Sequence, residues 1–462
     1  MKQYFCEKCQ RFLADRYVEG TCPYCDYHDA RGDQCDKCGH TYNAIELKNP
    51  RCKLDSQAPI VRESRHMFLD LPKLQTECEK WVEESNRRGQ WSNNGYVITK
   101  KWFAEGLQAR CITRDLKWGT PVPLPEFSDK VFYVWFDACI GYISITANYT
   151  KQWQRWWKNP EHVQLYQFMG KDNVPFHTVV FPSSLIGTRD QYTMLHHIST
   201  TEYLNYEDGK FSKSRGTGVF GDQARETGIP ADVWRYYLLA NRPETSDTNF
   251  SWSDLLLKTN TELLANMGNF VNRSLSFIKA KYSQRLPAAQ LGAPEKALFA
   301  SVDEELRAYI DAMEHVRLRD GLRAAMNVSR LGNQYLAEQK LDNALFTNER
   351  ARCDTVMAVC ANLIYVLSAL LGPFLPQTST TIAAQLNAPV RKIPEQFAID
   401  LLEGHTIGTP AHLFKRLEEK EIDRLKAKFA GTVEAKPEKK KRGGSKKPAA
   451  ADGAAKEATP TA

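Results

Sequence analysis

Cysteine pairs near the start of the sequence form the pattern with the clearest chemistry. Cys22 and Cys25 make one C-x-x-C pair, and Cys35 and Cys38 make another after nine intervening residues. Two such knuckles can present four thiolates to one tetrahedral ion, and a closed site of this type is structural rather than catalytic. We predict a structural Zn²⁺ site, with reduced structural cysteines or bound iron as the alternatives.

A second cysteine set near the start is less complete. Cys6 and Cys9 form a further C-x-x-C pair, and Cys52 lies where a partner knuckle would begin. Three residues later the sequence has Asp55 instead of a cysteine. Because a carboxylate can also bind zinc, these four residues are a possible second metal site, with unoccupied knuckle scaffolding as the alternative.

A glycine-flanked loop further along the chain could hold phosphates. Residues 210–216 read KFSKSRG and combine three cations with two hydroxyls. Such a loop is suited to hold phosphates while charge builds on a leaving pyrophosphate. A lysine-rich loop is more often a solvated surface, so the loop alone leaves both interpretations open.

Two apolar runs predict the elements that must position such a site. Residues 130–136 (KVFYVWF) and 163–169 (VQLYQFM) have the composition of buried parallel strands in an α/β sheet. In such sheets the ligand crevice lies at the carboxyl ends of the strands. The binding residues are therefore expected in residues 137–142 and 170–177.

Strand signals stop after about residue 250, and helical periodicity predicts an α-helical bundle for the C-terminal third. On the helix expected over residues 254–279, four polar residues fall four, three and four positions apart, beside an apolar face. They are Glu262, Asn266, Asn269 and Arg273. By residue type alone this stripe is either a solvated face or a surface that binds a partner.

Composition narrows the class of protein. The 462 residues are 42% hydrophobic and 25% charged, which fits several globular domains. The start MKQYFCEKC shows no export signal, and no apolar run has the length of a membrane span, so we expect a cytosolic protein without membrane contact. In that compartment metal binding is favoured over disulfides. Residues 431–462 are rich in Lys, Ala and Pro and are predicted to be disordered.

The basic loop and its surroundings carry a family resemblance. Residues 201–216, TEYLNYEDGKFSKSRG, resemble the second signature (K-M-S-K-S) of class I aminoacyl-tRNA synthetases, with Phe211 in the Met position as in the cytosolic eukaryotic methionyl enzymes. Similar segments are RFLADRYVEGTCPYC, ARGDQCDKCG, CITRDLKWGTPVPL, KVFYVWFDACIGYISITANYT and KDNVPFH. By resemblance the chain is identified as a member of this methionyl-tRNA synthetase family up to about Gly431.

The resemblance implies a fold and an order of domains. The fold is α/β: part of a Rossmann-like nucleotide-binding domain with an inserted zinc-knuckle connective peptide, then an α-helical anticodon-binding bundle and a disordered basic tail. The implied domains are the knuckle at 1–60, the rest of the connective peptide at 61–125, the second half of the catalytic domain at 126–205, the KFSKS-loop linking domain at 206–252, the anticodon-binding domain at 253–430 and the tail at 431–462.

It also implies an activity, that of a methionine–tRNA ligase in translation. Such an enzyme activates L-methionine with ATP and Mg²⁺ to methionyl-adenylate. It then transfers the methionyl group to initiator and elongator tRNA(Met) in the cytosol, where other translation factors are possible partners. Zinc would be structural in this protein.

Roles follow for residues that match the family motifs. Trp135, Tyr142, Asn173 and His177 would line the methionine pocket; Asp172 would bind the ATP ribose; Lys210 and Lys213 would be catalytic and, with Ser212, bind ATP; Asn269 and Arg273 would read the anticodon. Aromatic faces suit a thioether, and a hydroxyl or imidazole able to donate toward sulfur would help to reject leucine.

The sequence departs from the family pattern at two places. The first signature, of the H-I-G-H type, is not found in the 462 residues, so we expect impaired activation of methionine by this chain. The alternative is a non-catalytic, zinc-containing tRNA-binding fragment. The family also has a Trp after the NQY segment, whereas residues 333–346 have none, and Phe346 is predicted to replace it.

Overall fold

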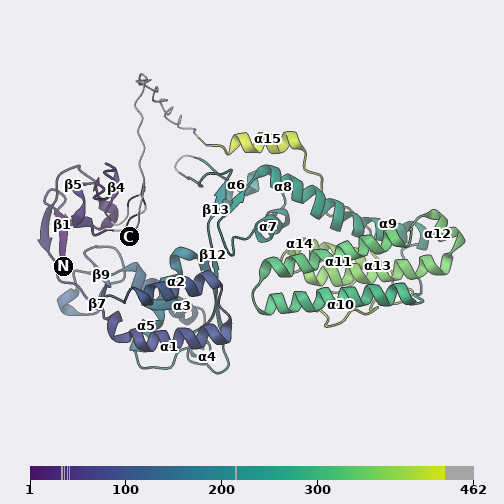
Figure 1. Cartoon of the computed structure of the whole chain (residues 1–462), viewed down its shortest axis with the longest axis horizontal. Coiled ribbons are helices and arrows are strands. Elements are labelled where there is room, and N and C mark those ends of the chain that lie inside the picture. The colour runs from purple at the N-terminus through teal and green to yellow at the C-terminus, as the bar shows by residue number, and fades with distance from the viewer. Residues whose placement is uncertain (33–34, 36, 39, 41, 214–215, 432–462) are drawn as a thin grey trace, which may run out of the picture.

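The computed structural model describes residues 1–32, 35, 37–38, 40, 42–213 and 216–431 (Figure 1). Ser214 and Arg215 of the basic loop lie outside the described residues. So do residues 432–462, which include nearly all of the tail predicted to be disordered.

The N-terminal unit consists of two small antiparallel sheets. One has the strand order β2-β1-β6 and the other the order β4-β3-β5. Their strands are β1 (Lys2–Cys6), β2 (Arg11–Phe12), β3 (Val18–Thr21), β4 (Ala30–Arg31), β5 (Lys48–Cys52) and β6 (Ile60–Glu63). Four of the nine buried residues in the core of this unit are cysteines, so ordinary apolar packing is scarce.

The larger α/β region is built around two parallel strands, β11 (Leu165–Gly170) and β12 (Leu195–Thr201). Helices α1 (Leu71–Gly89) and α2 (Asn93–Ala104) both pack against β12. The hydroxyl of Ser85 on α1 donates to the carbonyl of Leu195 at 2.5 Å, which ties the helix to the strand. The prediction of a strand over 163–169 is therefore confirmed within two residues.

The strand predicted over residues 130–136 is largely wrong. Only β10 (Val131–Phe132) is extended, and it pairs antiparallel with β9 (Thr113–Arg114) instead of joining the parallel sheet. Helix α3 (Val134–Tyr149) begins inside the run, where the N–H of Asp137 donates to the carbonyl of Tyr133. A short apolar run does not by itself distinguish a strand from the first turn of a helix.

Short elements complete this half of the molecule. They are β7 (Phe68–Leu69), which pairs with β8 (Arg110–Cys111); α4 (Gln154–Trp157); the π-helical turn η5 (Phe176–Val180), followed by α5 (Phe181–Gly187); β13 (Leu204–Tyr206), parallel to β14 (Thr248–Phe250); and α6 (Gly221–Glu226) and α7 (Ala231–Ala240). β14 is the last strand in the described residues, which agrees with the expected end of strand signals near residue 250.

A helical bundle follows, as predicted. Helix α8 (Trp252–Lys258), the π-helical segment η6 (Thr259–Gly268) and α9 (Asn269–Tyr282) follow one another without a break and form a long rod. The other helices are α10 (Ala293–Glu314), α11 (Leu318–Glu338), α12 (Asn343–Asn348), α13 (Arg350–Leu371), α14 (Pro376–Leu386) and α15 (Glu419–Lys428).

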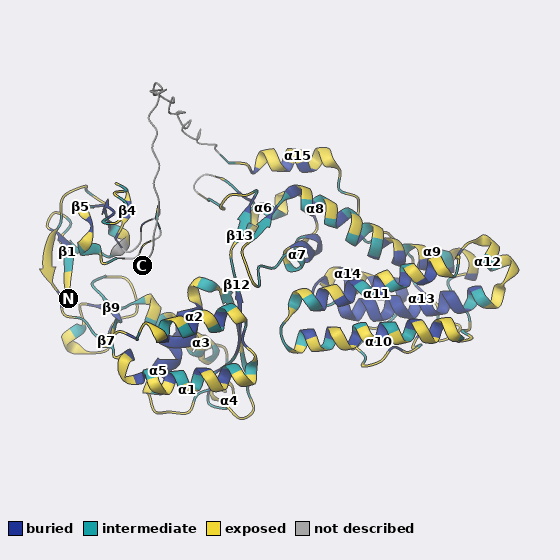
Figure 2. Ribbon diagram, viewed as in Figure 1, coloured by how far each residue is buried: buried dark blue, intermediate teal, exposed yellow. Residues whose placement is uncertain are grey.

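Helix α13 is the centre of the bundle and is dark blue along most of its length in Figure 2. By length and composition it is the one helix in the described ranges that could cross a membrane, and 94% of its most apolar window is buried inside the fold. Its apolar character is thus that of a core helix. It ends at Gly372 and Pro373, as the sequence predicts.

Candidate functional site

The first cysteine set forms a compact cluster. The sulfur atoms of Cys22, Cys25, Cys35 and Cys38 all lie within 4.8 Å of one another. The Cys22–Cys38 and Cys25–Cys35 sulfur pairs are 3.8 and 3.7 Å apart. Sulfurs bound tetrahedrally at the usual Zn–S distance are separated by about 3.8 Å, so the cluster fits a zinc ion.

The electrostatics of one thiol in this cluster, Cys35, favour metal binding, whereas burial raises the pKa of Cys25 to about 12. Burial raises the pKa of Cys35, but the backbone N–H groups of Cys38 and Lys37 outweigh burial and bring that pKa down to about 7. A thiol with such a pKa is partly thiolate at neutral pH, and thiolate is the form that binds metals.

The residues of the second cysteine set also lie close together. The ligand atoms of Cys6, Cys9, Cys52 and Asp55 lie within 4.8 Å of one another. The Cys6 and Cys9 thiols donate to one oxygen of Asp55, at 3.2 and 3.1 Å. The backbone N–H of Gln57 and the Cys9 thiol lower the pKa of Asp55, so its side chain is a carboxylate that can serve as a ligand.

Tyr142 and His177 form the centre of the predicted methionine pocket. Tyr142 lies on α3 and His177 on η5, and the Tyr142 hydroxyl is 2.8 Å from Nε2 of His177. Nδ1 of His177 is 2.8 Å from the carbonyl of Asn173, which can only accept, so Nδ1 carries the proton. Burial lowers the pKa of His177, and the ring is therefore neutral at pH 7. Hence the Tyr142 hydroxyl donates to Nε2.

This proton arrangement bears on one expectation from the sequence, that a hydroxyl or imidazole donates toward the sulfur of methionine. Both Nδ1–H of His177 and the hydroxyl proton of Tyr142 are already used within the protein. Neither group therefore has a free proton to donate toward a thioether in this arrangement. Discrimination by donation to sulfur would require this pair to rearrange.

The remaining predicted pocket residues lie around this pair. The Trp135 ring lies 5.7 Å from the ring of Phe176, next to His177, and the guanidinium of Arg110 lies 4.1 Å from its centroid. Trp135 and Tyr142 are 38% and 39% exposed, so their rings are accessible. The side chain of Asn173 is exposed, and it is the backbone carbonyl of this residue that contacts His177.

Asp172 lies just beyond the carboxyl end of β11, where the sequence predicts ligand binding. Both of its carboxylate oxygens accept from the hydroxyl of Tyr203, at 2.6 Å. The neighbouring Lys171 ammonium pairs with Glu202 at 2.5 Å. Tyr203 was missed by the sequence reasoning, although its place two residues after the end of β12 is a signal that could have found it.

The basic loop connects β13 to α6 and has a closed base. Ser212 and Thr217 exchange backbone hydrogen bonds of 2.9 and 3.0 Å. Phe211 packs against Tyr206 and lies over Gly218, where an added Cβ would be 2.2 Å from the Phe211 ring. Lys210 and Lys213 are exposed. Within the described ranges, neither forms a hydrogen bond or ion pair with Asp172 or the predicted methionine-pocket residues.

The polar stripe on the rod is divided into two parts. Asn266 is bonded internally: its side-chain oxygen accepts from Ser329 and Asn333 of α11, at 3.2 and 3.0 Å. Asn269 and Arg273, the predicted anticodon readers, are exposed. Arg273 also donates to the carbonyl of Leu341, at 2.7 Å, which holds its side chain beside the segment after α11.

The ring of Phe346, the predicted replacement for the family's Trp, is in contact with two other side chains. The ring of Tyr282 meets it edge to face at 5.4 Å, and the guanidinium of Arg350 lies 4.2 Å from its centroid. A base that stacked on the face covered by Arg350 would have to displace it.

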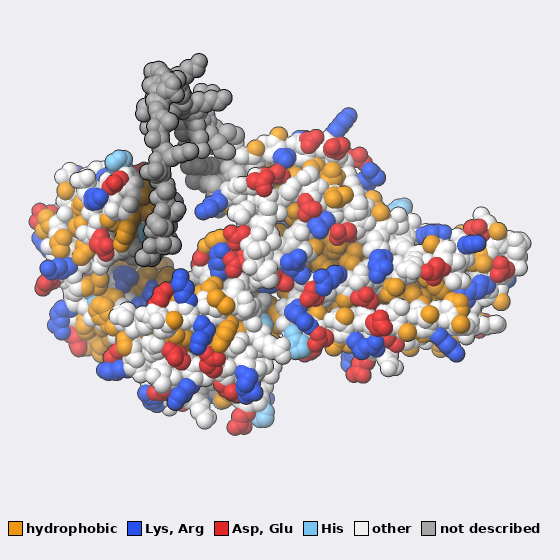
Figure 3. Space-filling view, in the orientation of Figure 1, with side chains coloured by type: hydrophobic (Ala, Val, Ile, Leu, Met, Phe, Trp, Pro, Cys, Tyr) orange, Lys and Arg blue, Asp and Glu red, His pale blue; other side chains and the backbone are white. Residues whose placement is uncertain are grey.

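Two hollows were not expected from the sequence. One, of about 610 Å³, lies near the start of α3 and is lined by Arg16, Arg114, Trp118, Tyr133 and Asp137, among others. The second, of about 300 Å³, lies between α7, η6 and α11. Figure 3 shows Lys and Arg side chains in the middle of the molecule, where the bundle meets the first half.

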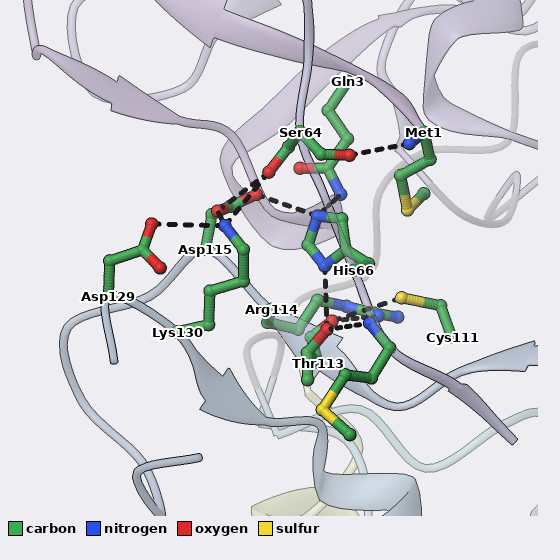
Figure 4. Close-up of polar contacts among 11 residues, drawn as sticks. Met1, Gln3, Ser64, His66, Cys111, Thr113, Arg114, Asp115, Asp129 and Lys130 are labelled. Atoms are coloured by element: carbon green, nitrogen blue, oxygen red, sulfur yellow. Dashed lines mark hydrogen bonds and ion pairs between the residues drawn. The ribbon is translucent and has the colours of Figure 1, made fainter. Parts of the chain in front are cut away.

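A buried polar network joins the N-terminal unit to the strand before α3 (Figure 4). The Lys130 ammonium is 2.5 Å from Asp115, whose other oxygen is 3.0 Å from Nε2 of His66. The Ser64 hydroxyl donates to Asp115 at 3.1 Å, and the N-terminal amine of Met1 donates to the Ser64 carbonyl at 2.7 Å. The network therefore connects β1 and β6 with β9 and β10.

Comparisons with known families cover both halves of the chain. The model of tRNA synthetases class I (M) matches residues 1–275. The model of the anticodon binding domain of methionyl tRNA ligase matches residues 286–434.

Curated relatives show the same similarity. A probable cytoplasmic methionine–tRNA ligase of Schizosaccharomyces pombe is 57% identical, over 93% of this chain and 56% of the relative. The cytoplasmic methionine–tRNA ligases of Saccharomyces cerevisiae and Homo sapiens are 54% and 53% identical, also over 93% of this chain, and 58% and 48% of their own lengths are covered. The chain thus spans about half the length of these relatives.

A solved structure has a similar fold. It is the Mycobacterium tuberculosis methionyl-tRNA synthetase bound by methionyl-adenylate, with a TM-score of 0.68, 20% identity, and coverage of 90% of this chain and 76% of that one. At this identity the likeness concerns the fold alone.

Proposed function

Because the chain belongs to the methionyl class I tRNA synthetases, we propose that it acts as a methionine–tRNA ligase. The observation that carries this proposal is the Tyr142–His177 pair, which bonds to the Asn173 carbonyl shortly after β11, with Asp172 just beyond the carboxyl end of the same strand. That is where ligands bind in parallel α/β sheets. The cytoplasmic relatives support action in the cytoplasm.

The reaction would proceed in two steps. A carboxylate oxygen of L-methionine attacks the α-phosphorus of ATP, supplied with Mg²⁺, and pyrophosphate leaves. A ribose hydroxyl of the terminal adenosine of tRNA(Met) then attacks the methionyl carbonyl carbon, and AMP leaves. Lys210 and Lys213, with Ser212, would stabilise the charge on the leaving pyrophosphate, since two exposed ammonium groups flank the closed base of the loop.

Substrate selection would rest on the residues around β11. Trp135 and Tyr142 offer accessible aromatic faces to a flexible thioether. His177 would hold Tyr142 in position through the hydrogen bond to Nε2, and Asn173 would hold His177 through its carbonyl. Asp172 would accept from the ATP ribose, provided that the ribose hydroxyls replace the Tyr203 hydroxyl.

The metal and the domain limits belong to the same proposal. Zn²⁺ in the first cysteine cluster would replace missing apolar packing in the unit of residues 1–60, and the second cluster would bind zinc through three thiolates and Asp55. The helical domain from residue 253 would bind the anticodon, with Asn269 and Arg273 reading base edges. The last strand in the described residues ends at Phe250, which supports a domain boundary near residue 253.

Methionine-dependent exchange of pyrophosphate into ATP tests the proposal. Because no H-I-G-H motif occurs in the 462 residues, exchange is measured for this chain and for a longer form that carries the motif. Lys213→Ala should reduce exchange on the order of a hundredfold, the scale of losing one preorganised charge-stabilising group. Lys279→Ala, an exposed lysine on α9, is the control.

One result would decide against the ligase. Absence of exchange in both forms would contradict it. If tRNA(Met) binding persisted in that case, the chain would instead be the non-catalytic tRNA-binding protein considered as the alternative.

A further inference from the structure

The hollow of about 300 Å³ beside the rod is strongly basic. Arg319, Arg323 and Arg330 of α11 form one wall, and Lys258 and Glu262 of the rod form the other. The three arginines are four and seven residues apart, so they lie on one face of α11. At the rise of an α-helix they span about 16 Å. All three arginines are exposed.

The charges of this hollow are only partly compensated. Glu262 is engaged by Lys258 at 3.6 Å and also accepts from the hydroxyl of Tyr236. Arg323 pairs with Asp320 at 2.6 Å, an exposed pair of the kind that contributes little free energy.

The other two arginines have no acidic partner in the described part of the chain. In that part of the chain Arg330 forms one hydrogen bond, to the amide oxygen of Asn327 at 3.5 Å, and Arg319 forms none. The hollow therefore carries more positive than negative charge and can attract a polyanion.

The hollow is continuous with the predicted anticodon readers. Glu262 and Asn266 line it, and Asn269 and Arg273 follow on the same polar stripe of the rod. The rod and α11 lie side by side along this path, because Asn266 bonds Asn333 and Arg273 bonds the Leu341 carbonyl. In Figure 1 the rod and α11 extend from the far end of the bundle toward α7.

We propose that this hollow binds the sugar-phosphate backbone of the tRNA, on the path from the anticodon toward the catalytic half. Planar guanidinium groups bind phosphate oxygens in bidentate fashion, and such contacts position an RNA without reading its sequence. This inference rests on the proposed function, which supplies the tRNA. It assigns Arg319, Arg323 and Arg330 to backbone contacts and leaves base recognition to Asn269 and Arg273.

The test compares tRNA affinities of the full chain and of a variant that combines R319Q, R323Q and R330Q. Affinity for tRNA(Met), and for the same tRNA with a changed anticodon, is measured over a range of salt. The variant should lose affinity on the order of tenfold or more for both RNAs at low salt. The slope of log affinity against log salt should fall by about one unit for each lost phosphate contact.

Two controls make the result specific. R307Q removes an exposed arginine of α10 that does not line the hollow and should leave both affinities unchanged. Asn269→Ala should lower affinity for the matching anticodon only. If the triple variant has reduced helix content by circular dichroism, R319Q alone is used, because Arg319 forms no hydrogen bond or ion pair in the described part of the chain. R319Q should lower the affinity for both RNAs and reduce the salt slope by about one unit.

The outcomes separate this inference from the proposed function. Wild-type affinity in the variant, or a loss limited to the matching anticodon, would overturn the backbone site while the ligase proposal stands. A wild-type chain that binds no tRNA at low salt would contradict tRNA binding by this chain altogether.

Discussion

The backbone N–H of Gly218 donates to the carbonyl oxygen of Phe429, at 3.0 Å, across more than two hundred residues of sequence. Phe429 follows α15, and its ring stacks on the buried Trp252 at the start of the rod, with centroids 6.1 Å apart. Lys426 of α15 adds an ion pair of 2.9 Å to Glu207, just before the basic loop. Helix α15 therefore holds the end of the basic loop against the rod.

Phe429→Ala should release this loop. Truncation of a buried Phe costs about 3–5 kcal/mol, so α15 should detach locally and trypsin should cleave faster after Lys210 and Lys213. The measurement is the rate of loop cleavage by mass spectrometry. Lys420→Ala, an exposed change on the same helix, is the control. Equal cleavage rates in Phe429→Ala and wild type would show that α15 does not restrain the loop.

Asp115→Asn should destabilise the first half of the molecule. It leaves the buried ammonium of Lys130 without its closest charge partner, at a cost of about 3–5 kcal/mol. Since eight of the ten Trp residues lie between residues 81 and 157, Trp fluorescence during urea unfolding reports mainly on this half. Asp129→Asn removes the exposed second partner of the same lysine and should cost less than about 1 kcal/mol. Similar costs for both variants would argue against the buried network as a link.

Glu295 should make the bundle sensitive to acid. Its buried carboxylate accepts from Arg352 at 2.6 Å, Tyr335 at 2.5 Å and the Gly292 N–H at 2.8 Å. Burial raises the pKa of Glu295, but these donors prevail and lower it from 4.5 to about 2. Because the pKa is lower in the folded state, the stabilisation is complete above pH 4.5 and is lost as pH falls toward 2.

This shift corresponds to roughly 3 kcal/mol at neutral pH. Glu295→Gln should therefore be less stable than wild type at pH 7 in urea unfolding followed by circular dichroism, and the difference should shrink below pH 4. Glu304→Gln, an exposed change on the same helix, should show no such trend. A difference between Glu295→Gln and wild type that did not depend on pH would contradict this account.

Removal of metal should unfold the N-terminal unit and leave the bundle intact. The core of this unit is rich in cysteine, so metal–ligand bonds are expected to supply its stability. Metal content by elemental analysis should fall by one zinc ion per chain in Cys25→Ser and by a further ion in a variant that adds Asp55→Ala. Cys111→Ser, outside both clusters, should retain all metal. Iron in place of zinc, or no loss in Cys25→Ser, would refute the zinc assignment.

Most of the features that could be predicted from the sequence depend on the spacing of neighbouring residues. The C-x-x-C knuckles, the loop KFSKSRG and the end of α13 at Gly372 depend on residues close together in sequence, where geometry follows from a few backbone angles. The run over residues 130–136 was wrong for a related reason. An apolar run of this length is compatible with a strand or with the start of a helix, and only the antiparallel partner Thr113–Arg114 and the turn at Tyr133 decide between them.

The sequence by itself determined the family, the two cysteine sets and the polar stripe of the rod. Only the tertiary structure decided which residues of the stripe remain accessible. The side chain of Asn266 is hydrogen-bonded to α11, whereas Asn269 is exposed. The tertiary structure also decided which atom carries the proton in the Tyr142–His177 hydrogen bond. It further decided that arginines of α11 and residues of the rod line the same hollow. These properties depend on contacts between residues far apart in the chain, and such contacts follow from packing, which no local pattern encodes.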